Sequence, residues 1–219
     1  MSDATHLSRT RATYDLVAEA YAERLGGELA GKPLDRALLL ACAEMVRDGG
    51  GGPVADIGCG PGHVTAHLAG LGLDVFGIDL STCMLAVARA SHPQLRFEQG
   101  SMLGLPVADG QLAGIVALYS IIHMPADHLP IAFAEFARVL RPGGHLLLAF
   151  QAGDDDHTLI TERFDRLVSI DAYRWSPDGI AERLGQAGLH VVMRMVRDPG
   201  PEESSPRAYL LARAPEVVR

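Results

Sequence analysis

The stretch VADIGCGPGHVT, residues 54–65, places Gly58, Gly60 and Gly62 at alternate positions directly after a short apolar run. Glycine adopts positive φ without steric cost and lets a ligand approach bare backbone. A helix that follows such a loop offers free N–H groups and the positive end of its dipole. The stretch therefore predicts a strand, a loop that binds a nucleotide-like cofactor, and a helix.

Short apolar runs alternate with helical patterns through the middle of the chain. Strands are expected at residues 53–58, 74–79, 95–100, 112–120 and 145–150. Helices are expected at 61–71, opened by Pro61, at 81–91, capped by Ser81, and at 127–140. Such alternation predicts a parallel sheet with helices on both faces.

The end of the chain has a different pattern. A helix at 176–188 precedes two strand-like runs, 189–197 and 207–214, and the loop between these runs has no room for a crossover helix. The two runs are therefore expected to form an antiparallel hairpin on the edge of the sheet. The expected fold is α/β, with a Rossmann-like, seven-stranded and mostly parallel sheet.

We expect a single domain over residues 1–219. Residues 8–48 have a helical pattern and are expected to cover one end of the sheet, whereas 151–175 is the irregular segment.

Composition excludes several classes of protein. The net charge is −8, which argues against coating nucleic acid by charge alone. The three cysteines form no CxxC pair, as expected in a reducing compartment. The longest apolar run, 112–122, is too short to span a bilayer, and the first residues lack the apolar core of a signal peptide. We expect a cytoplasmic monomer or homodimer without membrane or nucleic-acid partners.

A second acid supports the cofactor hypothesis. Asp79 ends the second expected strand, where a carboxylate can accept hydrogen bonds from ribose hydroxyls. The dinucleotide pattern requires a third glycine three residues after Gly60, and His63 stands there instead. A nicotinamide-dependent reductase is therefore the less favoured reading.

Three segments resemble the class I S-adenosylmethionine-dependent methyltransferases. DIGCGPG fits their first motif, GIDLSTCML fits the motif of the second strand, and FARVLRPGGHLLLAF fits the segment before and along the fifth strand. The reversed last strand also fits, so the resemblance extends over roughly residues 14–213. It implies S-adenosylmethionine as the cofactor and methyl transfer as the activity.

The resemblance implies roles for the residues of the glycine loop. Asp56 would support the loop and reach the amino group of the cofactor. The backbone of Gly58, Cys59 and Gly60 would lie against the methionine portion, and Asp79 would bind the ribose hydroxyls.

The resemblance also implies an adenine site. Leu80 and Met84 would pack on the adenine face, although ordinary core packing is an equal alternative for Met84. Members of the family often have an acid after the third strand, where this chain has Ser101. The Ser101 side chain or the Met102 amide could take that contact.

The segment YDLVAEAYAE, residues 14–23, resembles the N-terminal helix that folds over the cofactor in this family. Tyr14 and Tyr21 are two helical turns apart and share a face. These two tyrosines could either contact the cofactor or pack as the apolar face of an amphipathic helix.

The segment YSIIHMP, residues 119–125, follows the fourth strand, beside the expected methyl group. Tyr119 is assigned to the cofactor site and His123 is the candidate catalytic base, because a neutral histidine can accept a proton near pH 7. A structural role for His123 stays open, since positioning alone can supply much of the rate. His128 is expected to cap the next helix and to face water.

No metal site is expected. His63 and His67 have the i, i+4 spacing of metal ligands, but no nearby acid or cysteine completes a set. The acids of DDDH, residues 154–157, are adjacent and cannot easily converge on one ion.

A small-molecule methyl acceptor is favoured. Amino-group methylases of nucleic-acid bases in this family carry an Asn/Asp-Pro-Pro-aromatic run after the fourth strand, and this chain has Ser-Ile-Ile-His there. Segment 151–175 is the candidate acceptor lid, carrying Phe164, Tyr173, Arg174 and Trp175. Oxygen, nitrogen and carbon nucleophiles stay open, as does a protein that binds the cofactor without catalysis.

Overall fold

The structure is a computed structural model that describes residues 3–201 and 203–216. Its helices are α1 (Asp3–Leu25), α2 (Pro33–Asp48), α3 (His63–Gly70), α4 (Thr82–Ser91), α5 (Leu129–Val139) and α6 (Pro177–Gln186), with short 3-10 helices η1 (Glu28–Gly31) and η2 (Ile121–His123). Its strands are β1 (Val54–Ile57), β2 (Val75–Asp79), β3 (Arg96–Gln99), β4 (Leu112–Leu118), β5 (Leu140–Gln151), β6 (Asp156–Arg163), β7 (Arg166–Arg174), β8 (His190–Arg197) and β9 (Arg207–Arg213).

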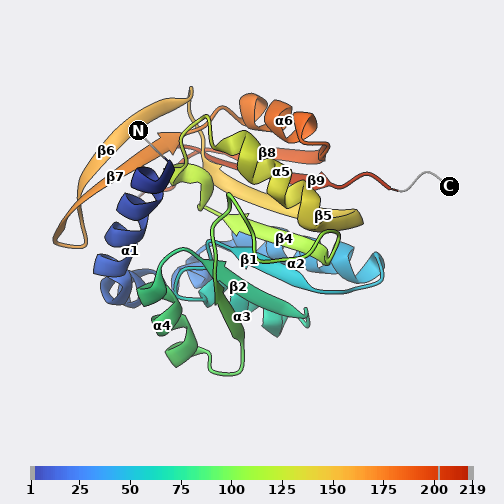
Figure 1. Ribbon diagram of the computed structural model, residues 1–219, viewed down its shortest axis with the longest axis horizontal. Helices are drawn as coiled ribbons and strands as arrows, with labels where there is room; N and C mark the ends of the chain where they lie inside the picture. Colours follow the sequence, from blue (N-terminus) through green and yellow to red (C-terminus); the bar gives the residue numbers. More distant parts are fainter. Residues whose placement is uncertain (1–2, 202, 217–219) are drawn as a thin grey trace.

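Seven strands form one twisted sheet in the order β3-β2-β1-β4-β5-β9-β8 (Figure 1). The first five pair in parallel, and β9 is antiparallel to both β5 and β8. The predicted α/β fold and the antiparallel C-terminal hairpin are therefore confirmed. The strand order reverses beside β1, and in open α/β sheets ligands bind at the carboxyl ends of the strands at such a point.

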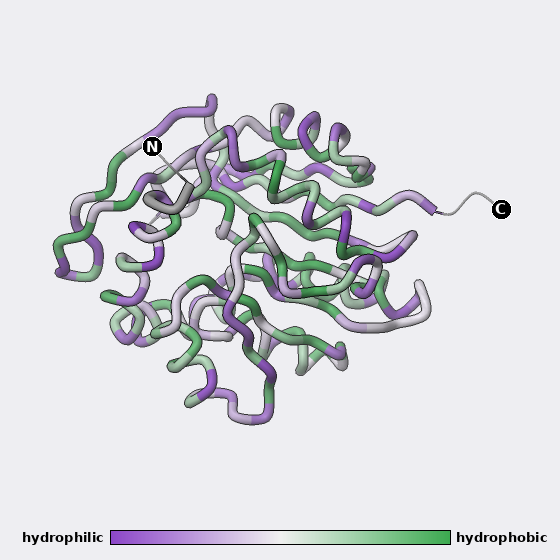
Figure 2. Tube along the Cα trace, in the orientation of Figure 1, coloured by the Kyte–Doolittle hydropathy of each residue, from purple (hydrophilic) through white to green (hydrophobic). Residues whose placement is uncertain are grey.

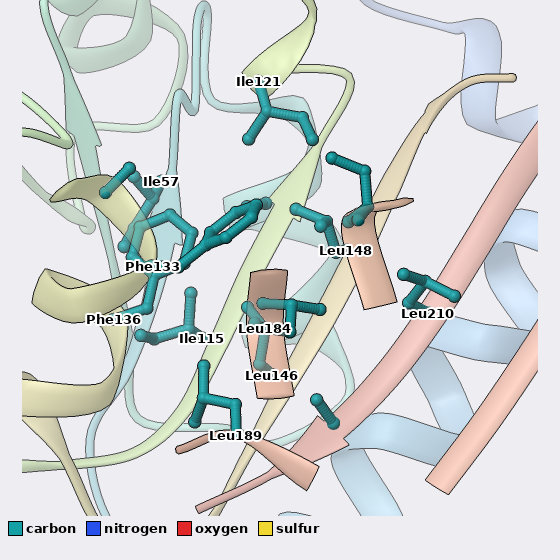
Figure 3. Close-up of a cluster of buried hydrophobic side chains, with 14 of the residues drawn as sticks. Ile57, Ile115, Ile121, Phe133, Phe136, Leu146, Leu148, Leu184, Leu189 and Leu210 are labelled. Carbon is teal, nitrogen blue, oxygen red and sulfur yellow. The ribbon is translucent and has the colours of Figure 1, made fainter. Parts of the chain in front are cut away.

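Helices cover both faces of the sheet. On one face α5 and α6 bury Phe133, Phe136 and Leu184 against Ile115 and Leu148 of the central strands (Figure 3). On the other face α2 and α3 pack against the strands through a second apolar cluster. The central strands are correspondingly hydrophobic along most of their length (Figure 2). Burial of both faces explains why β4 is a continuous apolar run without alternation.

The N-terminal cover is only partly as predicted. Helix α1 begins at Asp3 and lies past one end of the strands, beside the β6–β7 hairpin (Figure 1). Helix α2, by contrast, packs on a face of the sheet rather than over its end.

The prediction that residues 151–175 are irregular is wrong. Strands β6 and β7 form a separate two-stranded antiparallel sheet, and Phe164 and Asp165 form the two-residue turn between them. Both turn residues have positive φ, as in the type I′ turns that match the twist of a hairpin. The turn lacks the glycine that marks most such hairpins.

Two element boundaries also differ from prediction. Helix α3 begins at His63, so Pro61 lies in the preceding loop and not in the first turn. Strand β5 begins at Leu140 rather than at His145, with a register shift in its pairing to β4. Ser81 caps α4 as predicted, because its side chain accepts a hydrogen bond from the Met84 N–H.

Two constraints act on Gly62, the N-cap of α3: its backbone conformation and the space around it. Its φ is 85°, in the left-handed region, and a Cβ at this position would lie 2.7 Å from the Phe97 ring. Gly188 has nearly the same φ, 84°, but a Cβ there would meet no atom within 4 Å. The two positions therefore share the backbone constraint and differ in packing.

We expect Gly188→Ala to lower the free energy of unfolding by about 1–2 kcal/mol, the cost of left-handed backbone in a residue with a Cβ. Gly62→Ala should cost about 1–3 kcal/mol more, because the Phe97 ring must also move. Urea unfolding of both variants at neutral pH measures the difference. Equal losses would show that packing against Phe97 does not constrain this cap.

Candidate active site

The glycine loop follows β1 and meets the loop that follows β4. Gly58 has a φ of 76°, and a Cβ added to it would collide with the Cβ of Ser120. The Gly58 N–H donates to the carbonyl of Ile78, at a distance of 2.8 Å. The absence of a side chain at Gly58 thus lets the loops after β1 and β4 approach each other at the carboxyl edge of the sheet.

Asp79 ties this loop to the next element of the edge. One carboxylate oxygen accepts the Gly60 N–H at 2.8 Å, and the other accepts the Ser81 N–H at 2.8 Å. Burial raises the pKa of Asp79, while these two donors act in the opposite direction. Each oxygen keeps a second lone pair for a hydroxyl group.

A cavity of about 910 Å³, counted out to the surrounding solvent, opens above these loops. It is lined by residues of α1, of the loops after β1, β2 and β3, of the segment after β4, and by His128. Every predicted site residue except Asp56 and Cys59 lines it: Tyr14, Tyr21, Gly58, Gly60, Asp79, Leu80, Met84, Ser101, Met102, Tyr119 and His123.

Asp56 and Cys59 lie outside the wall of the cavity. The Asp56 carboxylate is 2% exposed and accepts a hydrogen bond from the Thr65 hydroxyl at 2.6 Å, which ties β1 to the first turns of α3. Burial raises the pKa of Asp56 to about 6. The Cys59 side chain packs with Phe97 and Leu85 beneath the loop. The Asp56 carboxylate therefore binds inside the protein, between β1 and α3, and does not face the cavity.

Two polar residues shape the cavity through their own hydrogen bonds. The Ser101 hydroxyl accepts the Leu103 N–H at 3.2 Å and so holds the turn after β3. Tyr119 has a φ of 54°, which is unusual for a residue with a side chain. Its hydroxyl lies 3.0 Å from that of Tyr209 and donates to Asp35 at 3.3 Å, a network that holds this conformation.

His123 and Tyr14 form the central polar contact of the cavity. The Tyr14 hydroxyl lies 2.6 Å from His123 Nε2, and His123 Nδ1 lies 2.6 Å from the backbone carbonyl of Asp171. A carbonyl can only accept, so Nδ1 carries the proton. Nε2 is then unprotonated and accepts the hydrogen bond that Tyr14 donates.

Burial keeps both side chains uncharged near neutral pH. It lowers the pKa of His123 from 6.5 to about 4, although the Asp171 carbonyl acts in the opposite direction. Burial likewise raises the pKa of Tyr14 above its ordinary value of 10. The pair thus presents a neutral hydroxyl backed by a neutral imidazole, which is an arrangement that can accept a proton.

The N-terminal part of α1 forms a cavity wall that the sequence analysis did not identify. His6, Thr10 and Tyr14 stand at i, i+4 and i+8, on one face of the helix, and all three line the cavity. This spacing is visible in the sequence and could have identified the three residues as one surface of the helix. His128 is the N-cap residue of α5 as expected, although its side chain makes no capping hydrogen bond. The expectation that it faces water is wrong: it is 4% exposed, lines the cavity, and packs edge-on against the His6 ring.

The aromatic residues of segment 151–175 do not line the cavity. Trp175 is 1% exposed, and its indole N–H donates to the Ile121 carbonyl. Tyr173 stacks on Trp175, Arg174 pairs with Asp156, and Phe164 packs edge-on against Tyr21. The hairpin therefore supports the cavity from behind α1 and η2.

Over the described ranges, the side chains offer no group of three or more metal-ligating residues, and no helix has the length and apolar character to cross a membrane.

Residues 54–144 match the family model of the methyltransferase domain. The chain is 31% identical over 148 residues to the O-methyltransferase cnsE of Penicillium expansum, an alignment that covers 64% of this chain and 52% of that protein. It is 33% identical over 143 residues to a malonyl-[acyl-carrier protein] O-methyltransferase of Pectobacterium atrosepticum, covering 64% of this chain and 55% of the relative. The chain thus spans about half the length of these curated relatives.

Solved structures share the whole architecture. A structure described as a DhpI–SAH complex superposes with a TM-score of 0.76 at 21% identity, covering 98% of this chain and 99% of that one. The 1,6-didemethyltoxoflavin-N1-methyltransferase of Burkholderia thailandensis gives a TM-score of 0.63 at 19% identity, covering 93% and 91%. At these identities the likeness shows the fold. Together with the domain matched at residues 54–144 and the two relatives, it indicates a class I S-adenosylmethionine-dependent methyltransferase, a family of enzymes whose cofactor is S-adenosylmethionine.

Proposed function

We propose that this protein transfers the methyl group of S-adenosylmethionine to a hydroxyl group of an uncharged small molecule. The observation that carries the proposal is the 2.6 Å contact between the Tyr14 hydroxyl and His123 Nε2 in the wall of the cavity. The cofactor, when bound, supplies a methyl group on a positively charged sulfur. The chain must then bind that donor, orient the acceptor and take up a proton.

The residues at one end of the cavity fit the cofactor. The cradle after β1 would be filled by a Cβ at Gly58, and the Asp79 carboxylate has lone pairs left for ribose hydroxyls. Leu80 and Met84 supply the apolar surface that a purine ring needs. In the proposal Ser101 and Met102 contact the adenine edge, and Tyr21 and Tyr119 enclose the methionine portion.

The opposite end of the cavity favours an uncharged acceptor. His6, Leu7, Leu103 and Met124 line it, and burial lowers the pKa of His6, so this imidazole is neutral at pH 7. Asp79, placed at the ribose, is the one carboxylate among the described residues that line the cavity; Asp171, 4.0 Å from His6, does not line it and is paired with Arg9, and the Arg11 guanidinium lies 3.5 Å from Asp15. A cationic amine would find no counter-charge here, and that loss is costly in a buried site.

The proton has a defined route. The acceptor hydroxyl donates to the Tyr14 oxygen as the Tyr14 proton moves onto His123 Nε2. The other proton stays on Nδ1, hydrogen-bonded to the Asp171 carbonyl throughout, so the imidazole becomes a cation held by two hydrogen bonds. The names of the two O-methyltransferase relatives support an oxygen nucleophile.

The proposal includes a cytoplasmic, single-domain protein. Cys42, Cys59 and Cys83 are free, as is typical of a reducing compartment.

We expect Asp79→Asn to weaken binding of S-adenosylhomocysteine at least 10-fold, because an amide cannot accept from the Gly60 and Ser81 N–H groups at the same time. The matched control is Asp74→Asn, which changes an exposed acid just before β2, at the far end of the same strand. Titration calorimetry measures affinity, and a thermal melt checks that both variants fold. Wild-type affinity in Asp79→Asn would remove its role at the ribose.

We expect His123→Gln and Tyr14→Phe each to slow turnover about 10²-fold while S-adenosylhomocysteine affinity changes less than threefold. Because the two groups form one proton route, the double variant should be no slower than the slower single variant. The assay follows S-adenosylhomocysteine release with a panel of phenols, alcohols, amines and carboxylic acids. Losses that multiply in the double variant would show that the two side chains act separately.

Burial of His123 also predicts a pH-dependent stability. Its pKa is about 4 in the folded protein and 6.5 otherwise, so the unfolded chain binds more protons between these values. The stabilisation is present above pH 6.5 and is lost as the pH falls toward 4, by roughly 3 kcal/mol in total. Urea unfolding at pH 7, 5.5 and 4.5 should show a steeper loss for the wild type than for His123→Gln. Parallel curves for the two proteins would contradict a depressed pKa.

A further inference from the structure

The β6–β7 hairpin contributes a backbone atom to the candidate base. The carbonyl oxygen of Asp171, in β7, accepts the proton of His123 Nδ1 at 2.6 Å. This hydrogen bond joins segments 48 residues apart, and Asp171 itself does not line the cavity. The hairpin therefore acts on the base without touching the space where the ligands would bind.

The side chain of Asp171 fixes where that carbonyl lies. Its carboxylate is 14% exposed and accepts hydrogen bonds from Arg9 of α1 at 3.1 Å and from His157 of β6 at 2.7 Å. His6 Nδ1 is a further 4.0 Å contact. One carboxylate thus joins both strands of the hairpin to the helix that carries Tyr14.

The carbonyl decides which nitrogen of His123 can accept a proton. Without an acceptor at Nδ1, the imidazole could carry its proton on Nε2 instead. Nε2 would then donate to Tyr14 rather than accept from it, and the proton route would be blocked. Other groups that act on His123 are His6 of α1 and Arg163 of β6, whose charges would lower its pKa.

We propose that Asp171 is a positioning residue of this site: its carboxylate docks the β6–β7 hairpin on α1, and its backbone carbonyl holds His123 in the tautomer that leaves Nε2 free to accept a proton. This inference rests on the proposed function for its catalytic consequence. The tautomer itself can be measured without turnover.

The test compares Asp171→Asn with Asp156→Asn. Asp171→Asn keeps the shape and the backbone carbonyl but removes the charge that Arg9 and His157 bind. Asp156→Asn makes the same change in the same hairpin, where the acid pairs with Arg174 across the strands. His157→Ala is a milder second variant, because this side chain is 47% exposed and folding should tolerate its loss.

Two-bond ¹H–¹⁵N correlation spectra of the imidazoles give the tautomer, with His123 assigned from the His123→Gln spectrum. The wild type and Asp156→Asn should show His123 protonated at Nδ1 alone. Asp171→Asn should show a mixture of both tautomers, and His157→Ala a smaller change in the same direction. Turnover in Asp171→Asn should fall about 10-fold, while S-adenosylhomocysteine affinity stays within threefold.

A wild-type tautomer in Asp171→Asn overturns the inference, as does an equal shift in Asp156→Asn, which would indicate general loosening of the hairpin. Failure of the proposed function has a different signature. If His123→Gln turns over normally, the base assignment fails even where the tautomer depends on Asp171. If His123→Gln is slow but Asp171→Asn is not, the inference alone fails.

Discussion

The cavity depends on the two hydrogen bonds that the Asp79 carboxylate accepts from the Gly60 and Ser81 N–H groups. A loop without regular structure leaves N–H groups without partners, and those groups are costly when buried. Asp79 accepts from one on each side, so it joins the loop after β1 to the start of α4. The same donors favour the charged carboxylate against the effect of burial. These two hydrogen bonds therefore fix the glycine loop relative to the start of α4.

Helix α1 completes the site because it is attached to each part that surrounds the cavity. Asp15 accepts the Ser81 hydroxyl at 2.6 Å at the cofactor end, whereas Tyr14 bonds His123 at the centre. The Arg163 guanidinium of the hairpin lies 5.9 Å from the Tyr14 ring and 5.7 Å from the Tyr21 ring. In the proposed function this one helix encloses the cofactor and also carries one member of the proton route, so the two roles depend on the same contacts.

The sequence predicts the structural features that neighbouring residues determine. It does not predict those that depend on contacts between residues far apart in the chain. The glycine loop, the Ser81 cap and the β8–β9 hairpin follow from spacing over a few residues. The β6–β7 hairpin was missed because its Phe164–Asp165 turn has no glycine, although LVSI and LITE contain the β-branched residues that strands favour. Most residues that the resemblance assigns to the cofactor line the cavity. Tyr14 and His123 were each predicted for the site, but their contact was not, because they are 109 residues apart and only the packed structure brings them together.

Burial gives His123 two properties that act in opposite directions. A pKa of about 4 keeps its imidazole neutral across the physiological range, so the group is always able to accept a proton. The same pKa makes it a weak base, far from the match with the working pH that favours proton transfer. Basicity therefore contributes less here than geometry. Two short hydrogen bonds fix the ring, and orientation of reacting groups can supply a large part of a barrier reduction. In the proposed function the histidine accepts a proton because of where it is held, and the hairpin that holds it takes part in catalysis although it does not line the cavity.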